Sequence, residues 1–446
     1  MTEVCAFLFV VKRKTTITNN HIIIMKKTYT LLTKQEKKLS IFYILMFFPY
    51  IITILSHIFI DKVRLAANTW QVSEILINYQ GGFVRRGLIG EIIYQLHNIG
   101  IDALFSAYLF SIITAIIFFY IIIRDTIRKQ YSILLLPTVM LLSSLFVSGH
   151  WVRKDFFIML LFYAIVRLIQ QKSIYKYLFI NILLIIGTLT HEVIIFISAP
   201  ILFISLLSKE TKTPFAYIKT ILKGAIYYSP ALIVSLLVFI NKGDMLCATK
   251  IWDSWTKARV VNSEMKGAIA AIGWSMEKAI EVGTEVWTTI RCGVYYPIMW
   301  SLLAISGFII YTWMYKIKQP IMGYKPKNEF DIKESAYIII SQFLAMLPLL
   351  LVFADSSRTF FYVIMSAYII RLYDYNMLYK NTLGKLPVFM CHILQSIDTF
   401  ISKHLKGFAI FTFIIGLPSI SVSALEHIIL HGQIGFFIKS IVEMLK

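Results

Sequence analysis

The sequence carries little charge, few acidic residues and few cysteines. Asp, Glu, Lys and Arg make up 15% of its 446 residues, whereas a soluble domain carries about 25%. Four cysteines in a chain of this length are too few for a disulfide-stapled secreted module. Hydrophobic residues account for 58% of the chain, and the mean hydropathy is +0.72. These values exclude a soluble enzyme and a disordered chain, and they indicate an all-α, polytopic integral membrane protein.

Apolar segments recur along the whole chain. Crossing roughly 30 Å of hydrocarbon takes about 20 mostly apolar residues, and we predict about eleven such transmembrane helices, within a range of about ten to twelve. The predicted spans lie at 39–60, 101–123, 131–149, 156–170, 178–193, 194–208, 224–240, 295–315, 335–354, 359–375 and 408–425. The segment 428–446 is predicted to be either a weak further span or an interfacial helix.

No internal repeat or low-complexity linker divides the chain. We therefore predict a cytoplasmic N-terminal segment over 1–38 and a single integral membrane domain over 39–446. Met25 is followed by two lysines and would make an ordinary start for a basic leader, so residues 1–24 are either an extended start or part of the N-terminal segment.

The loops that alternate along this layout differ in charge. One set, which begins with the N-terminal segment, holds 28 Lys and Arg against 9 Asp and Glu. The opposite set holds 14 against 13, counting Asp102 at the edge of its first loop. Basic segments remain in the cytoplasm, so the N-terminus is predicted to be cytoplasmic. The net charge of +20 therefore reports orientation and does not indicate a nucleic-acid partner.

The two largest outer loops are predicted at 61–100 and 241–294. Cys247 and Cys292 bracket the second loop, where they form either a disulfide or two unpaired thiols. This loop also carries four tryptophans, which we interpret as interfacial anchors in preference to stacking platforms for sugars. They are Trp252, Trp255, Trp274 and Trp287.

An arginine pair among glycines stands in the first outer loop. Gly81 and Gly82 precede Arg85 and Arg86 in the segment Gly-Gly-Phe-Val-Arg-Arg-Gly. Glycine lets a backbone approach a ligand closely, and arginine makes bidentate, permanently charged contacts to phosphate. The pair therefore indicates an anionic partner. The alternative is a turn whose arginines are solvated or pair with nearby glutamates, Glu74 and Glu91.

Charged residues also stand at the ends of later spans. His150, Arg153 and Lys154 lie just before a predicted span and could extend an anion site, or form an ordinary solvated loop. Asp355 and Arg358 lie at another span start, where they could pair with each other or continue the anion site, the alternative being N-capping.

His191 and Glu192 interrupt an otherwise apolar stretch. A neutral imidazole and a carboxylate are a common acid/base pair. The alternative is a tight turn whose polar residues face water. A single His-Glu dipeptide lacks the spacing of a metal site, so we expect neither a metal nor another cofactor. All these clusters fall on the outer face, where cations beside apolar walls suit a substrate with a phosphate head and a lipid tail.

The layout of spans, the late outer loop and the Gly81–Gly87 segment resemble bacterial O-antigen and capsular polysaccharide polymerases, and more broadly membrane glycosyltransferases of the GT-C type. The resemblance implies an inner-membrane enzyme that joins polyprenyl-diphosphate-linked oligosaccharide units on the periplasmic face, with a chain-length regulator protein as partner. It implies that arginines bind the diphosphate and that a carboxylate or His activates the acceptor hydroxyl. The matching residues are Arg85, Arg86, Arg153 and Arg358 for the first role, and Glu192, His191 or Asp355 for the second.

Two other functions remain open. Many GT-C enzymes carry an acidic residue early in the first outer loop, and Asp61 occupies such a place, which favours a transferase using a polyprenyl-phosphate sugar with Asp61 as base. A flippase for lipid-linked oligosaccharide has a similar number of spans. It should place charges near the bilayer midplane and show two related halves, whereas this sequence has its charges at span ends.

Overall fold

The computed structural model describes residues 69–128, 152–207, 214–261, most of 264–282, 332–352 and 356–373, with a few helical residues between 378 and 442. Every regular element in these ranges is an α-helix, and none of these residues forms a strand. The prediction of an all-α protein is confirmed for this part of the chain.

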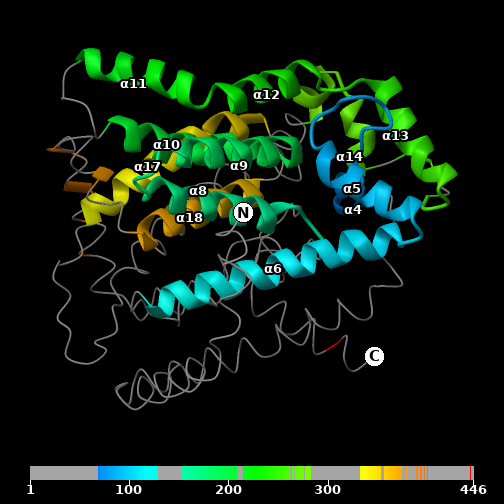
Figure 1. The fold of residues 1–446 in the computed structure, drawn as a ribbon, viewed down its shortest axis with the longest axis horizontal. Coiled ribbons are helices and arrows are strands. Elements are labelled where there is room, and N and C mark those ends of the chain that lie inside the picture. Colours follow the sequence, from blue (N-terminus) through cyan, green and yellow to red (C-terminus); the bar gives the residue numbers. More distant parts are fainter. Residues whose placement is uncertain are drawn as a thin grey trace.

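A bundle of long helices forms the body of the molecule (Figure 1). Helix α8 is central and packs against four others, because its sequence is apolar on every face. The bundle comprises α6 (Ala103–Arg128), α8 (Asp155–Ile169), α9 (Lys176–Thr190), α10 (Val193–Leu207), α17 (Ile332–Val352) and α18 (Ser356–Leu372). Phe156, Phe162 and Ile165 of α8 are fully buried. The core of the bundle therefore lies around α8.

One described helix, α6, is long and apolar enough to cross a membrane on its own, over Ala103–Thr126. A bent pair, Phe215–Tyr227 and Ser229–Ile240, would count as a second span if taken together. Helices α9 and α10 are apolar but shorter. The predicted spans at 39–60, 131–149, 295–315 and 408–425 lie outside the described residues.

The predicted spans at 194–208 and 224–240 leave residues 209–223 as a loop between them, and this prediction is partly wrong. Helix α11 (Pro214–Tyr227) occupies most of it, and α12 (Ser229–Ile240) follows after a bend of 79°. Pro230 causes the break because it has no N–H to continue the hydrogen bonding of α11. The side chain of Asn181 holds the bend, since it donates to the carbonyl of Tyr227 at 2.8 Å and accepts from the N–H of Ala231 at 3.2 Å.

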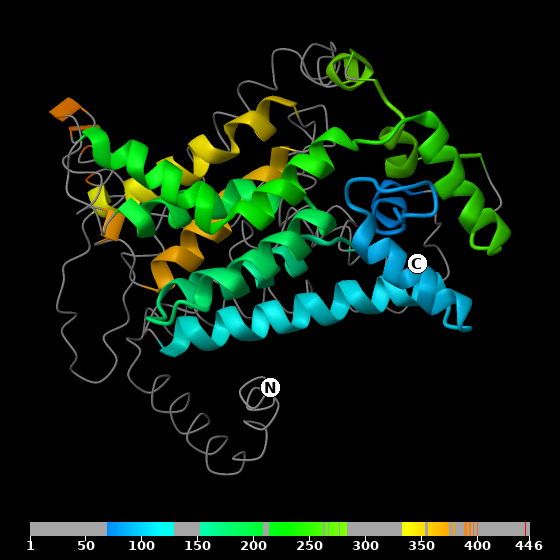
Figure 2. The same ribbon diagram turned by 45° about the horizontal axis from the view of Figure 1, so that its top comes forward.

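The two predicted outer loops fold against each other as a helical cap at one end of the bundle (Figures 1 and 2). The cap consists of α4 (Trp70–Ile75), α5 (Gly87–Asn98), α13 (Met245–Lys257) and α14 (Gly267–Ile272). The indole of Trp255 donates to the carbonyl of Leu76 at 2.8 Å, and the amide of Asn78 donates to the hydroxyl of Ser254 at 3.0 Å. These bonds join segments that lie more than 170 residues apart.

Two tryptophans predicted to be interfacial anchors are core residues instead. Trp252 and Trp255 are buried in the cap, because α13 turns its apolar face towards α4 and α5. Trp287 and Cys292 lie outside the described residues, and Cys247 is a free thiol. The anchor interpretation is therefore wrong for the two buried indoles.

The glycines of the first outer loop permit close packing of the backbone on itself and on α13. A Cβ on Gly81 would lie 2.4 Å from the carbonyl oxygen of Cys247, and one on Gly90 would lie 1.9 Å from that of Ile77. Gly82 has a φ of +112°, which L side chains rarely adopt. The structure thus gives Gly81 and Gly82 a role in folding the loop, and neither belongs to the polar cluster described below.

We expect Gly90→Ala to destabilise the fold by about 2 kcal/mol or more, because the added methyl group meets a backbone oxygen that cannot move aside. The matched control is Gly224→Ala in α11, where the nearest atom would be at an ordinary 3.6 Å. Thermal unfolding of the purified chain in detergent measures both. Equal midpoints for the two variants would contradict the packing described here.

Candidate functional site

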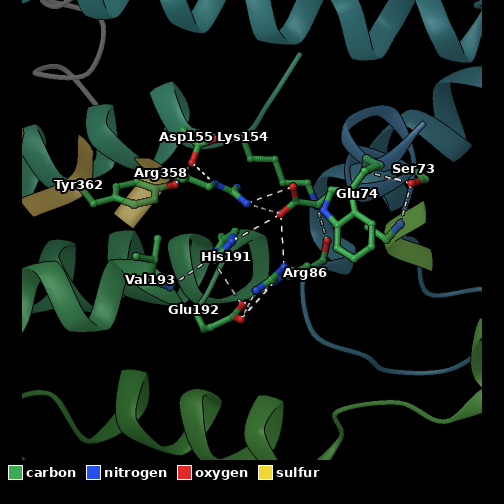
Figure 3. Close-up of polar contacts among 12 residues, drawn as sticks. Ser73, Glu74, Arg86, Lys154, Asp155, His191, Glu192, Val193, Arg358 and Tyr362 are labelled. Atoms are coloured by element: carbon green, nitrogen blue, oxygen red, sulfur yellow. Dashed lines mark hydrogen bonds and ion pairs between the residues drawn. The ribbon is translucent and has the colours of Figure 1, made fainter. Parts of the chain in front are cut away.

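A buried cluster of charged side chains lies where the cap meets the bundle (Figure 3). Its centre is Glu74 of α4, whose side chain is 1% exposed. Arg358 Nη1 donates to both carboxylate oxygens of Glu74, at 3.1 and 3.2 Å. Arg86 Nη1 and His191 Nε2 lie 3.4 and 3.5 Å from its Oε1. Side chains from three other parts of the chain therefore converge on one carboxylate.

Arg86 links Glu74 to Glu192. Its Nε donates to Glu192 at 2.9 and 3.2 Å, and its Nη2 donates to the same carboxylate. The backbone of Arg86 is left-handed, with a φ of +65°, and Arg86 occupies the N-cap position of α5. Lys154 Nζ donates to the Arg86 carbonyl at 2.7 Å. This bond stabilises a backbone conformation that is unfavourable for a residue with a Cβ.

Asp155 begins α8 and faces the start of α18. Its Oδ1 accepts from Arg358 Nε and from the hydroxyl of Tyr362. Its Oδ2 is buried and has no hydrogen-bond partner among the residues that the structure describes. Arg358 thus joins Asp155 to Glu74, and the ends of α4, α8 and α18 are held together.

Among the residues that the structure describes, cationic side chains outnumber carboxylates in this cluster. Five cations surround three carboxylates: the cations are Arg85, Arg86, Arg153, Lys154 and Arg358, and the carboxylates are Glu74, Asp155 and Glu192. Near neutral pH His191 is neutral and burial lowers the pKa of Lys154 to about 7, so the described cations exceed the carboxylates by between one and two charges. Buried charges must be paired, so the cluster as a whole suits a bound anion.

Burial and neighbouring charges set the protonation states. Burial alone would raise the pKa of Glu74, but Arg358 and Arg86 together hold it well below its ordinary value. Burial, assisted by Arg86, lowers the pKa of His191 well below 6.5. The N–H of Val193 donates to His191 Nδ1 at 3.3 Å, so the neutral imidazole carries its proton on Nε2, facing Glu74.

The accessible edge of the cluster is formed by Arg86 and Glu192, whose side chains are 13% and 22% exposed. Glu74, Lys154 and Asp155 lie behind them with almost no exposure. A ligand arriving at this edge meets Arg86 and Glu192 first. Burial alone would raise the pKa of Glu192, but Arg86 and then His191 hold it well below its ordinary value.

The structure brings most of the predicted site residues together. Arg86, His191, Glu192 and Arg358 are in direct contact with one another or with Glu74. The remaining members are Arg85 and Arg153, which interact electrostatically with Glu74, and Lys154, which interacts through the Arg86 backbone. Asp61, His150 and Asp355 lie outside the described residues.

The central residue, Glu74, was not among the predicted site residues. The alternative prediction, in which the arginine pair contacts Glu74 and Glu91, is correct for one of the two glutamates, because Arg86 pairs with Glu74. Glu91 instead accepts from the N–H of Tyr79 at 2.9 Å and from the amide of Gln80 at 3.0 Å. The signal that could have identified Glu74 is its place among apolar residues of a short helix, Val72 to Leu76.

A second polar cluster, at the other end of the bundle, was also missed. Asp125 Oδ2 accepts from the hydroxyls of Tyr163 and Tyr373, both at 2.6 Å, and its Oδ1 accepts from Arg124 at 2.8 Å. Arg167 donates to the Tyr373 hydroxyl at 3.3 Å. These bonds join the ends of α6, α8 and α18 on the side opposite the cap.

Within the described ranges, no three His, Cys, Asp or Glu side chains are placed to hold a metal ion. The chain matches no protein-family model, no curated protein and no solved structure. What the site does must therefore be inferred from its geometry and charge.

We expect Glu74→Gln to lower the free energy of unfolding by about 3 kcal/mol, because two buried arginines lose the charge that compensates them. The matched control is Glu281→Gln, whose exposed pair with Lys278 should contribute less than about 1 kcal/mol. Thermal unfolding in detergent measures both, and similar midpoints would show that Glu74 is not a structural centre.

Lys154 should make the stability depend on pH. Burial lowers the pKa of this buried amine to about 7, whereas a lysine in the unfolded chain titrates near 10.4. Between these values the unfolded chain binds the proton and the folded chain releases it. The free energy of unfolding therefore rises with pH, by up to about 1.4 kcal/mol per pH unit.

The Lys154→Met variant should lack this rise between pH 7 and pH 10. Thermal unfolding of both proteins across this interval is the measurement, and the difference between them removes the contribution of other titrating groups. Parallel curves would mean that the Lys154 amine stays protonated in the folded protein.

Proposed function

We propose that the chain is a polytopic membrane glycosyltransferase, a polysaccharide polymerase that joins polyprenyl-diphosphate-linked oligosaccharide units on the periplasmic face of a bacterial inner membrane. The observation that carries the proposal is the cluster around Glu74, in which arginines from separate segments converge with a surplus of positive charge. A diphosphate joined to a lipid and a sugar carries two negative charges, which a surplus of between one and two positive charges largely balances.

The apolar surface of the bundle supports a place in the bilayer. Residues 103–123 of α6 contain no charged side chain and extend about 31 Å, close to the thickness of the hydrocarbon layer. Their outward side chains are exposed and apolar, among them Phe105, Leu109, Ile116 and Tyr120. Polar clusters lie at both ends of the bundle, and α8 between them is apolar from Phe156 to Val166. This layering suits a protein with about eleven spans and the cap outside.

The proposed reaction is displacement at the anomeric carbon. An acceptor hydroxyl attacks that carbon, the bond from carbon to the diphosphate oxygen breaks, and the diphosphate leaves with the electron pair. Arg86 and Arg85 stabilise the charge that develops on the leaving group. Glu192 is the carboxylate on the accessible edge of the cluster and accepts the proton of the hydroxyl.

The pairing of Arg86 with Glu192 couples substrate binding to this proton transfer. Without substrate, Arg86 makes Glu192 a weak base by holding its pKa low. A diphosphate bound to Arg86 competes for the same guanidinium, and Glu192 becomes more basic when that contact weakens. Asp355 and Asp61 remain candidates for the same role.

The proposal predicts that Arg86→Lys abolishes long surface glycans. Lysine keeps the charge but loses the planar fork that contacts Glu192 and would bind phosphate, so polymerisation should fall about 100-fold. The matched control is Arg128→Lys, an exposed arginine at the far end of α6, which should polymerise normally. Gel profiles of surface glycan in a deletion host, at equal expression, measure both. Long chains from Arg86→Lys would rule out the site.

The glycans of a deletion strain distinguish a polymerase from a flippase. Loss of a polymerase should leave single repeat units on the final glycan acceptor. A flippase deletion should instead leave the undecorated precursor on the cytoplasmic face. Glycan profiling of the deletion strain distinguishes the two, and accumulation of cytoplasmic precursor would replace the proposed function with transport.

A further inference from the structure

A pair of indoles stands beside the charged cluster. Trp70 is the first residue of α4 and is 43% exposed, although its side chain is large and apolar. Its ring centroid lies 6.0 Å from that of Trp274, with the planes tilted by 51°. Trp274 follows α14 and is partly exposed. An aromatic pair left open to solvent in the cap calls for a ligand or a partner.

The position of Trp70 relative to Glu74 identifies the kind of ligand. The two residues are four apart in α4, so they lie on one face of the helix and about 6 Å apart along its axis. Glu74 contacts Arg358 and also Arg86, which is one of the two arginines assigned to the proposed anion site. The exposed indole therefore stands about one helical turn from the carboxylate that contacts Arg86, a residue of the proposed anion site.

Hydrogen bonds fix the indole pair in this position. The hydroxyl of Ser73 donates to the carbonyl of Trp70 at 3.0 Å and accepts from the N–H of Ala268 at 2.9 Å. Ser73 thereby joins α4 to α14, and α14 leads directly into the turn that carries Trp274. The two indoles thus belong to packed elements and are preorganised for contact.

The chemistry of the pair matches a sugar ring. A pyranose presents a face of C–H groups that carry slight positive charge, and the face of an indole is electron-rich and apolar. In a glycosyl diphosphate the ring is joined to phosphate through a single oxygen atom. A subsite for that ring must therefore lie next to the anion site, as Trp70 does.

We propose that Trp70 and Trp274 form the subsite that binds the sugar ring next to the diphosphate of the lipid-linked glycan. This inference rests on the proposed function and deepens it, because it separates recognition of the sugar from recognition of the phosphate. Arg85 and Arg86 bind the anion and the indoles bind the ring.

Binding of two probes to the purified full-length protein in detergent tests the assignment. The first probe is undecaprenyl diphosphate, which has no sugar, and the second is lipid-linked oligosaccharide extracted from a host that lacks the polymerase. We expect Trp70→Ala to weaken binding of the glycosylated probe about tenfold and to leave the undecaprenyl diphosphate affinity within about twofold. Trp70→Phe, which keeps an aromatic face, should retain most of the wild-type affinity for the glycosylated probe.

The controls separate this inference from the proposed function. Trp70→Leu keeps apolar volume without an aromatic ring and should behave like Trp70→Ala, which guards against a folding defect in the alanine variant. Tyr175→Ala removes a more exposed aromatic residue at the start of α9, outside the cap, and should change neither affinity. Arg86→Ala should weaken both probes.

Two results would overturn the sugar subsite while leaving the proposed function intact. One is equal weakening of both probes by Trp70→Leu, which would make Trp70 a structural residue or a membrane anchor. The other is that Trp70→Leu leaves binding of the glycosylated probe unchanged. If the wild-type protein binds neither probe, the proposed function fails and the subsite fails with it.

Discussion

The carboxylate of Glu74 is the constraint on which the arrangement of the protein depends. It is buried between Arg358 and Arg86, and removing charges from water costs several kcal/mol per ion unless they remain paired. Moving the cap away from the bundle would separate Glu74 from Arg358 and Arg86 from Glu192. The same contact that fixes the first outer loop therefore also positions Arg86 at the accessible edge. Under the proposed function, the ions that stabilise the fold are also those that recognise the ligand.

Much of the candidate site could be predicted from the sequence, because the sides of a membrane sort charge. Alternation of basic and neutral loops assigned Arg86, Lys154, His191 and Arg358 to one face, and the structure places them in one cluster. That these residues share Glu74 is harder to predict. The apolar neighbours of Glu74 in the short helix α4 mark it as buried, but its partners come from segments up to 284 residues away. Only the folded chain brings them together.

The errors have a common physical origin, since each treated a loop as an exposed, separate segment. An interfacial anchor should be exposed. Trp255 is instead fully buried, because the two outer loops cover each other. Gly81 was interpreted as room for a ligand, yet that room is filled by the backbone of α13. The segment before α12, predicted to be a cytoplasmic loop, is largely helix α11, which packs on α10. The hydropathy of a sequence does not reveal which loops pack against each other.

The contact between Arg86 and Glu192 has a consequence for selectivity. In the free protein Glu192 acts as a tethered counter-ion, because it holds the guanidinium with the geometry of a bound anion. A tethered group is present at a high effective concentration, so a monovalent ion such as chloride displaces it poorly. A ligand that also contacts Arg85 gains a second attachment and displaces it readily. Under the proposed function, this pairing shields the resting site from monovalent salt and favours displacement by polyvalent anions.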